Sequence, residues 1–126
     1  MKIFLFFISF LAINCSDTGN ITNQEIEKEA LKKLEQKIIA FADKSVCSEE
    51  FTCAFTGFGS KPCGGNWSYL VYSSSIDTTT FLAKVDHYNT LEKEYNIKYG
   101  ISSDCAIVSP PSSIICENKK CKAIYN

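Results

Sequence analysis

The cysteines of this chain constrain its fold more than any other feature, because its 126 residues contain seven of them. An odd number leaves one thiol unexplained in an exported, disulfide-bonded protein. Zinc sites usually show ligand pairs of the C-x2-C type, and no pair here has that spacing. His87 is the only histidine, so we expect no metal site. The thiol-oxidoreductase and haem-attachment motifs both need C-x-x-C, so we expect neither. The seven are Cys15, Cys47, Cys53, Cys63, Cys105, Cys116 and Cys121.

The N-terminal residues account for the odd cysteine. An apolar run from Ile3 to Phe10, broken only by Ser9, follows a lysine, which is the layout of an export signal. The run is too short for a bilayer-spanning helix, which needs roughly 20 apolar residues. The stretch "LAINCSD" resembles a bacterial lipoprotein signal, in which the peptidase cuts before a cysteine that then carries lipid. Asn14 stands where Gly, Ala or Ser is usual. The alternative is an ordinary cleaved signal, with Cys15 discarded or left free.

These features predict three parts of the chain. Residues 1–14 are the expected lipoprotein signal peptide, residues 15–22 the lipidated cysteine and tether, and residues 23–126 a single domain. The expected location is the cell envelope, with the protein anchored to the membrane through its N-terminal lipid. If Cys15 is acylated, six cysteines remain, which is enough for three disulfides. Each disulfide would contribute about 2–4 kcal/mol.

Two stretches predict long helices. Thr22 and Glu25 form a capping box, and apolar residues at four-residue spacing follow, which indicates a helix over about 23–43. Asp77 can cap a second long helix that begins directly after it, and Gly100 is well placed as its C-terminal stop.

The remaining segments predict strands. Residues 51–58 alternate bulky and small side chains, and "SIICENKKCKAIY" indicates a β-hairpin around a polar turn. The stretch "NWSYLVYSSS" fits a short helix or a strand, and we favour the helix. The predicted fold is α+β, with two long helices and a short one packed on a small antiparallel β-sheet and stabilised by disulfides.

Four stretches carry a resemblance that covers most of residues 47–126. They are "GSKPCGGNWSYLVYSSSID" at 59–77, "YNTLEKEYN" at 88–96, "SDC" at 103–105 and "PPSSIICENKKC" at 110–121. With them the chain resembles a family of small, cysteine-rich exported bacterial proteins of unknown function. The family motif usually reads PCGGP, and Asn66 replaces its second proline here. The family has no established activity, so the resemblance implies none for this chain.

The resemblance implies a disulfide framework that involves Cys47, Cys63, Cys105 and Cys116, with Cys53 and Cys121 as an additional pair. Geometry permits that additional pair, because both residues lie on predicted strands. A competing pair, Cys116–Cys121, would straddle the hairpin turn. We prefer Cys53–Cys121, and then Cys63–Cys105.

The loop "GFGSKPCGGNW" at 57–67 combines four glycines with a proline, a cysteine and the only tryptophan. Glycine permits sharp turns and close approach, and Pro62 fixes one dihedral angle. The loop is either a disulfide-pinned connection that packs its tryptophan into the core or a preformed recognition loop. The candidate binding residues are Gly59, Ser60, Lys61, Gly64, Gly65 and Trp67.

No pattern in the chain predicts catalysis. His87 and Asp86 are adjacent on a predicted helix and do not face each other, and the G-x-x-x-x-G-K-[ST] phosphate loop is absent. The net charge is −1 and no basic stripe is visible, so we expect no nucleic-acid partner and no cofactor. The expected function is a non-enzymatic, lipid-anchored envelope protein that binds a protein partner or has a structural role. The alternative is an inhibitor of a secreted hydrolase that presents the Ser60–Lys61 loop, although Pro62 counts against substrate-like protease inhibition.

Overall fold

The structure, a computed structural model, describes residues 22–126. The expected signal peptide, Cys15 and nearly all of the tether lie outside the described residues. Neither described helix is long and apolar enough to cross a membrane. In chain order the elements are α1 (Asn23–Asp43), β1 (Cys53–Phe58), β2 (Ser68–Ser73), α2 (Thr78–Lys98), β3 (Ser113–Glu117) and β4 (Lys120–Ile124).

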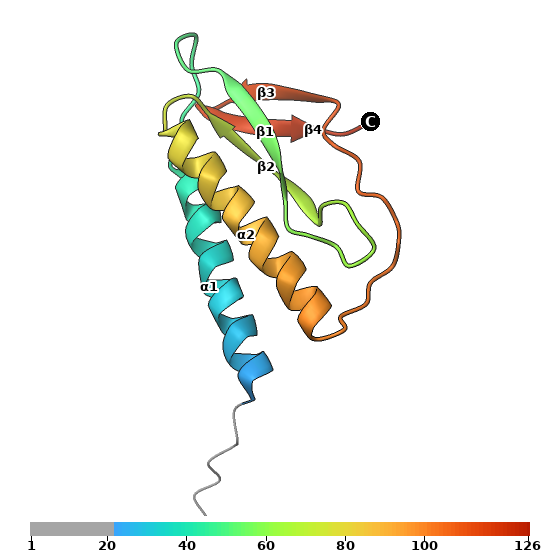
Figure 1. Cartoon of the computed structure of the whole chain (residues 1–126). Helices are drawn as coiled ribbons and strands as arrows, with labels where there is room; N and C mark the ends of the chain where they lie inside the picture. Colours follow the sequence, from blue (N-terminus) through green and yellow to red (C-terminus); the bar gives the residue numbers. More distant parts are fainter. Residues whose placement is uncertain (1–21) are drawn as a thin grey trace, which may run out of the picture.

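Both long helices begin and end where the sequence predicts. The Glu25 backbone amide donates to the Thr22 hydroxyl at 3.2 Å, and the Thr22 amide donates to the Glu25 carboxylate at 2.8 Å, so the predicted capping box is confirmed. Asp77 accepts a hydrogen bond from the Thr80 amide at the start of α2. Gly100, with φ of +59°, follows the end of α2. The two helices lie side by side and run in opposite directions (Figure 1).

The short third helix that we predicted is wrong, because residues 68–73 form strand β2. This strand pairs antiparallel with β1, with Phe55 opposite Val71 and Cys53 opposite Ser73. Alternate residues of a strand point to opposite faces. Here Tyr72 reaches the core, while Tyr69 packs edge-on against Phe55 on the other face. Aromatic and branched side chains that are used on both faces favour a strand over a helix.

The single sheet that we predicted is also wrong. β3 pairs only with β4, and β1 pairs only with β2, which gives two separate antiparallel sheets of two strands each. The predicted hairpin around the ENKK turn is confirmed, with Cys116 directly opposite Cys121. Asn118 and Lys119 have φ of 50° and 62°, and a type I′ hairpin turn requires a positive φ at both of its central residues. The fold is therefore mixed α+β, with two helices and two small hairpins.

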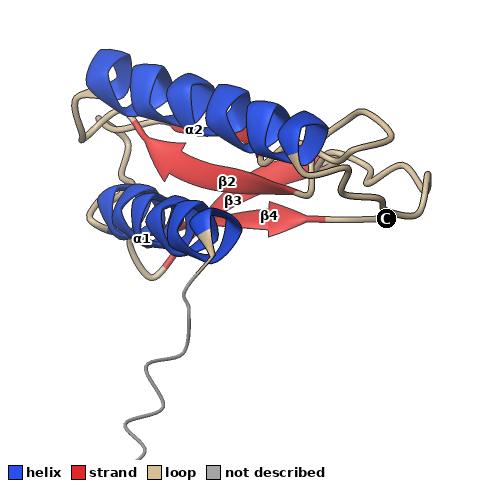
Figure 2. Cartoon of the chain, turned by 60° about the horizontal axis from the view of Figure 1, so that its bottom comes forward, coloured by secondary structure: helices blue, strands red, loops and turns tan. Residues whose placement is uncertain are grey.

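The buried core lies between the helices and the first hairpin. Phe81 is fully buried, and its ring packs at 4.8 Å from that of Tyr72 and at 5.7 Å from that of Phe41. No residue of β3 or β4 belongs to the buried core cluster of the described chain. The first hairpin lies between α2 and the second hairpin (Figure 2). The core residues are Ile38, Ala42, Phe58, Tyr72, Phe81, Val85 and Tyr88.

Three disulfides join segments that are far apart in the sequence. Cys53 is bridged to Cys121 and Cys63 to Cys105, so both preferred pairings are confirmed. The third bridge joins Cys47 to Cys116. Two of the three bridges therefore attach the second hairpin to the segment that leads from α1 into β1.

Candidate functional site

The 57–67 loop is held in place by polar side chains on one stripe of α2. Asn89 accepts a hydrogen bond from the Gly59 amide at 2.7 Å, and Glu92 accepts one from the Ser60 amide. Asn96 donates to the Ser60 carbonyl at 2.8 Å. The spacing of three and four residues places these three side chains on one helix face. The loop backbone is thus fixed by α2 at Gly59 and on both sides of Ser60.

Lys61 points into the protein and not toward solvent. The residue is only 5% exposed, and its ammonium donates to the Asp104 carboxylate and to the Ala106 carbonyl, both at 2.7 Å. The hydrogen bond from Lys61 and a second from the Ala106 amide hold the pKa of Asp104 below its ordinary value. The Lys61 side chain is therefore a brace between two loops. The inhibitor interpretation requires this side chain to be displayed, so its placement removes the main support for that alternative.

The other candidate loop residues have different placements. The ring of Trp67 lies 5.1 Å from the Lys61 ammonium, and Trp67 remains 43% exposed, so this tryptophan is not packed into the core. Gly59 is buried beneath it with φ of +81°, whereas Gly64 and Gly65 are exposed turn residues with positive φ.

A small cavity lies beside Trp67. Its volume is about 280 Å³, and its wall contains Phe58, Trp67 and Tyr88 together with the carboxyl groups of Glu35 and Glu92. The rings of Phe58 and Tyr88 are stacked at 4.8 Å. α1 supplies Glu35, α2 supplies Tyr88 and Glu92, and the first hairpin supplies Phe58. The cavity therefore forms where α1, α2 and the braced loop meet.

Burial changes the acidity of two groups in this wall. Burial raises the pKa of the Glu92 carboxyl above its ordinary value, and the nearby charge of Glu35 adds to the effect, although the hydrogen bond from the Ser60 amide opposes it. Burial, with the charges of Glu92 and Glu35, also raises the pKa of the Tyr88 hydroxyl. That hydroxyl lies 3.4 Å from the second Glu92 oxygen. Two carboxyl groups thus lie together in this wall, and burial makes it costly for Glu92 to ionise without a partner of opposite charge.

An adjoining hollow of about 370 Å³ continues from this cavity along α1. It shares Glu35, Trp67, Tyr88 and Glu92 with the cavity, and Lys28 and Lys32 line its further part. A separate groove of about 440 Å³ between the two helices is mainly apolar, and the Lys98–Glu27 ion pair lies at it.

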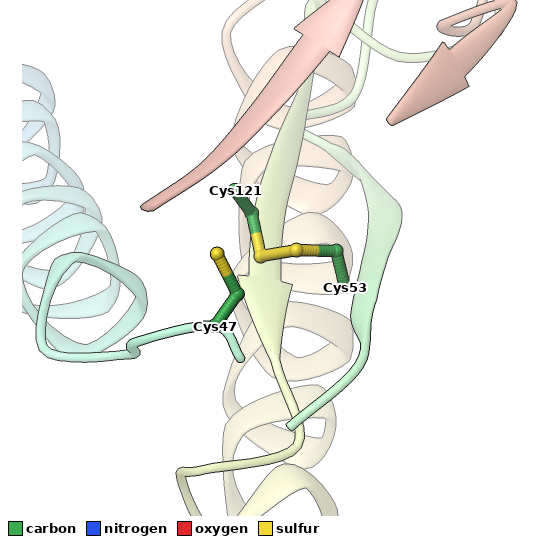
Figure 3. Close-up of side chains that lie close together, drawn as sticks. All are labelled: Cys47, Cys53 and Cys121. Atoms are coloured by element: carbon green, nitrogen blue, oxygen red, sulfur yellow. A yellow bond between two sulfur atoms is a disulfide. The ribbon is translucent and has the colours of Figure 1, made fainter. Parts of the chain in front are cut away.

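The cysteines form a second cluster, at the junction of the two hairpins. The sulfur atoms of Cys47, Cys53 and Cys121 all lie within 4.8 Å of one another (Figure 3). They meet because Cys116 and Cys121 are opposite each other in the second hairpin, and each is bridged to the segment before or within β1. Metals bind thiolates, and all three sulfur atoms are in disulfides here, so this cluster is a structural junction.

The sequence predicts the loop as a candidate site but does not predict the cavity. The glycines, Trp67 and Cys63 marked the loop as unusual, and the structure brings Gly59 and Trp67 to the cavity wall. Glu35 and Glu92 lie 57 positions apart on two different helices, and no local pattern in the sequence brings them together. The one available signal was the Asn89, Glu92 and Asn96 stripe, since polar residues at this spacing lie on one helix face and can hydrogen-bond a single neighbouring segment.

Comparison with protein-family models, with curated proteins and with solved structures gives no match for this chain.

Proposed function

We propose that this protein is a non-enzymatic, lipid-anchored protein of the cell envelope, and that it uses the braced loop and the adjacent cavity for binding. The observation that carries the proposal is the pairing of all six cysteines after Cys15 into three disulfides. Stable disulfides are typical of exported proteins and rare in the cytosol. With these six cysteines paired, Cys15 is the remaining one of the seven, and its place in the lipoprotein signal makes it the proposed lipid carrier.

The geometry of the loop supports binding. Its backbone is fixed by α2, and the Cys63–Cys105 bridge and the Lys61–Asp104 ion pair attach it to the segment that follows α2. A surface that is already ordered loses less conformational entropy when it binds. Trp67 is the large aromatic group exposed at this surface, and tryptophan is enriched among residues that dominate binding energy.

Anchoring is tested by expressing the full chain in a bacterium and partitioning the membranes between detergent and aqueous phases. We expect the wild type to enter the detergent phase, and mass spectrometry to find a diacylglyceryl group on Cys15. The variant Cys15→Ser should move to the aqueous phase, whereas Ser16→Ala, the matched control, should behave as wild type. An unmodified Cys15 in the wild type, together with free thiols at the other six positions, would overturn the proposal.

A further inference from the structure

We infer that the cavity beside Trp67 binds a compact organic ammonium cation, with the cationic head group lying against the aromatic wall and its charge balanced by Glu35 and Glu92. This inference assigns a ligand class to the cavity, and it does not depend on whether Cys15 carries lipid.

The charges of the cavity point to a cation. Two carboxyl groups line it, and no basic residue of the described chain does so. Among residues 22–126, no ion pair involves Glu35 or Glu92. The hydrogen bonds that Glu92 accepts come from neutral groups, the Ser60 amide and the Tyr88 hydroxyl. Even a half-buried carboxylate such as that of Glu92 is costly to ionise without an opposite charge, and a bound ammonium group would supply that charge.

The aromatic wall selects the kind of cation. Phe58, Trp67 and Tyr88 line the same cavity as Glu35 and Glu92. The face of an aromatic ring attracts ammonium groups, and cages of such rings recognise quaternary ammonium ligands. Trp67 already lies near the Lys61 ammonium, whose charge is balanced by Asp104 at 2.7 Å. Hard metal cations prefer a full shell of oxygen ligands, whereas this wall combines two carboxyl groups with three aromatic side chains.

The size of the cavity fits a head group and not a large ligand. Its volume of about 280 Å³ lies at or below the lower end of ordinary small-molecule sites. A bulkier cation would have to extend into the adjoining hollow, where Lys28 and Lys32 lie. Those two lysines disfavour a second positive charge there, so we expect a monovalent cation to bind better than a diamine.

Trp67 provides the assay, because it is the only tryptophan in the chain. Choline chloride is titrated into the purified full-length protein while tryptophan fluorescence is recorded. We expect a saturable change that sodium chloride at equal ionic strength does not produce. The neutral isostere 3,3-dimethylbutan-1-ol has the same shape without the charge, and we expect it to bind at least about tenfold more weakly.

Two variants locate the site. Glu35→Gln and Glu92→Gln keep side-chain size and hydrogen-bonding ability, and each should weaken choline binding by at least about tenfold. Glu94→Gln removes a charge from α2 at the separate groove and should leave binding unchanged. Circular dichroism shows whether each variant is folded. If the neutral isostere binds as well as choline, if choline gives no saturable change, or if Glu94→Gln has the same effect as Glu35→Gln, the inference is wrong. Detergent partitioning of the same sample tests anchoring separately.

Discussion

Glu92 combines two roles that make different demands on its charge. One of its oxygens fixes the loop through the Ser60 amide, and the carboxyl group also forms part of the cavity wall. The first role favours the ionised form, because an amide donor stabilises a carboxylate. Burial opposes ionisation and has the larger effect, since the net shift of the Glu92 pKa is upward.

This raised pKa predicts how stability changes with pH. A carboxyl group with a higher pKa in the folded state stabilises the fold below its unfolded-state pKa, and this contribution is lost as pH rises through the folded-state value. As pH rises from the ordinary range of a glutamate carboxyl group through the raised pKa of Glu92, we therefore expect the wild type to lose stability relative to Glu92→Gln. Urea unfolding at each pH measures the difference. Glu35 also faces this group, so Glu35→Gln should reduce the pH dependence. A constant difference between wild type and Glu92→Gln would contradict the prediction.

The burial of Lys61 shows what sequence cannot reveal at this scale. Its neighbours Ser60 and Pro62 mark a turn, and lysine is almost never fully buried unless it is paired. Its partner Asp104 lies 43 positions away, in a segment with no regular secondary structure. The Cys63–Cys105 bridge joins the two segments next to this ion pair, and the connectivity of that bridge was itself uncertain from sequence.

At the scale of elements, the loop and α2 fit together because Gly59 leaves room for two side chains. A Cβ atom at this position would lie 2.8 Å from the Trp67 ring and 3.1 Å from the Glu92 carboxylate. Gly59 also has φ of +81°, where side chains other than hydrogen are strained. Both effects act at the place where the loop crosses α2.

This arrangement predicts a difference between two glycines. Gly64→Ala should destabilise the fold by about 1–2 kcal/mol, because its φ is positive although nothing lies within 4 Å of the new Cβ. Gly59→Ala should cost roughly 1–3 kcal/mol more, because Trp67 must move. Urea unfolding gives both values, and the Trp67 emission spectrum should shift only in Gly59→Ala. Equal destabilisation by the two substitutions would contradict this account of the loop.

The helices were predictable because their caps are local, whereas strand β2 was not. Thr22, Glu25 and Asp77 act within three residues of themselves, so their sequence spacing is sufficient. Leu70 and Val71 fit either a helical turn or a strand when they are read alone. Pairing with Thr56 and Phe55 of β1 decides the outcome, and such pairing depends on the rest of the fold.

At the scale of the whole molecule, the second hairpin is attached to the rest of the protein without contributing residues to the buried core cluster. The Cys47 amide donates to the Lys119 carbonyl at 3.0 Å, and the Lys120 ammonium donates to the carbonyls of Asp43 and Ser45 near the end of α1. Isolated two-stranded hairpins are marginally stable in water. The bridges Cys47–Cys116 and Cys53–Cys121 are therefore the main attachment of β3 and β4 to the rest of the protein.

This attachment predicts a specific dependence on the two bridges. Replacing one pair with alanines should cost about 3 kcal/mol, because the other bridge keeps the hairpin docked and the lost bridge closes only a ring of about a dozen residues. Replacing both pairs should release the hairpin, so amides of β3 and β4 exchange rapidly while those of α2 stay protected. Hydrogen exchange measured by mass spectrometry distinguishes these states. Removing Cys63–Cys105 is the matched control, since it should leave exchange in the hairpin unchanged. If β3 and β4 stay protected without either bridge, packing and not covalent attachment holds the second hairpin in place.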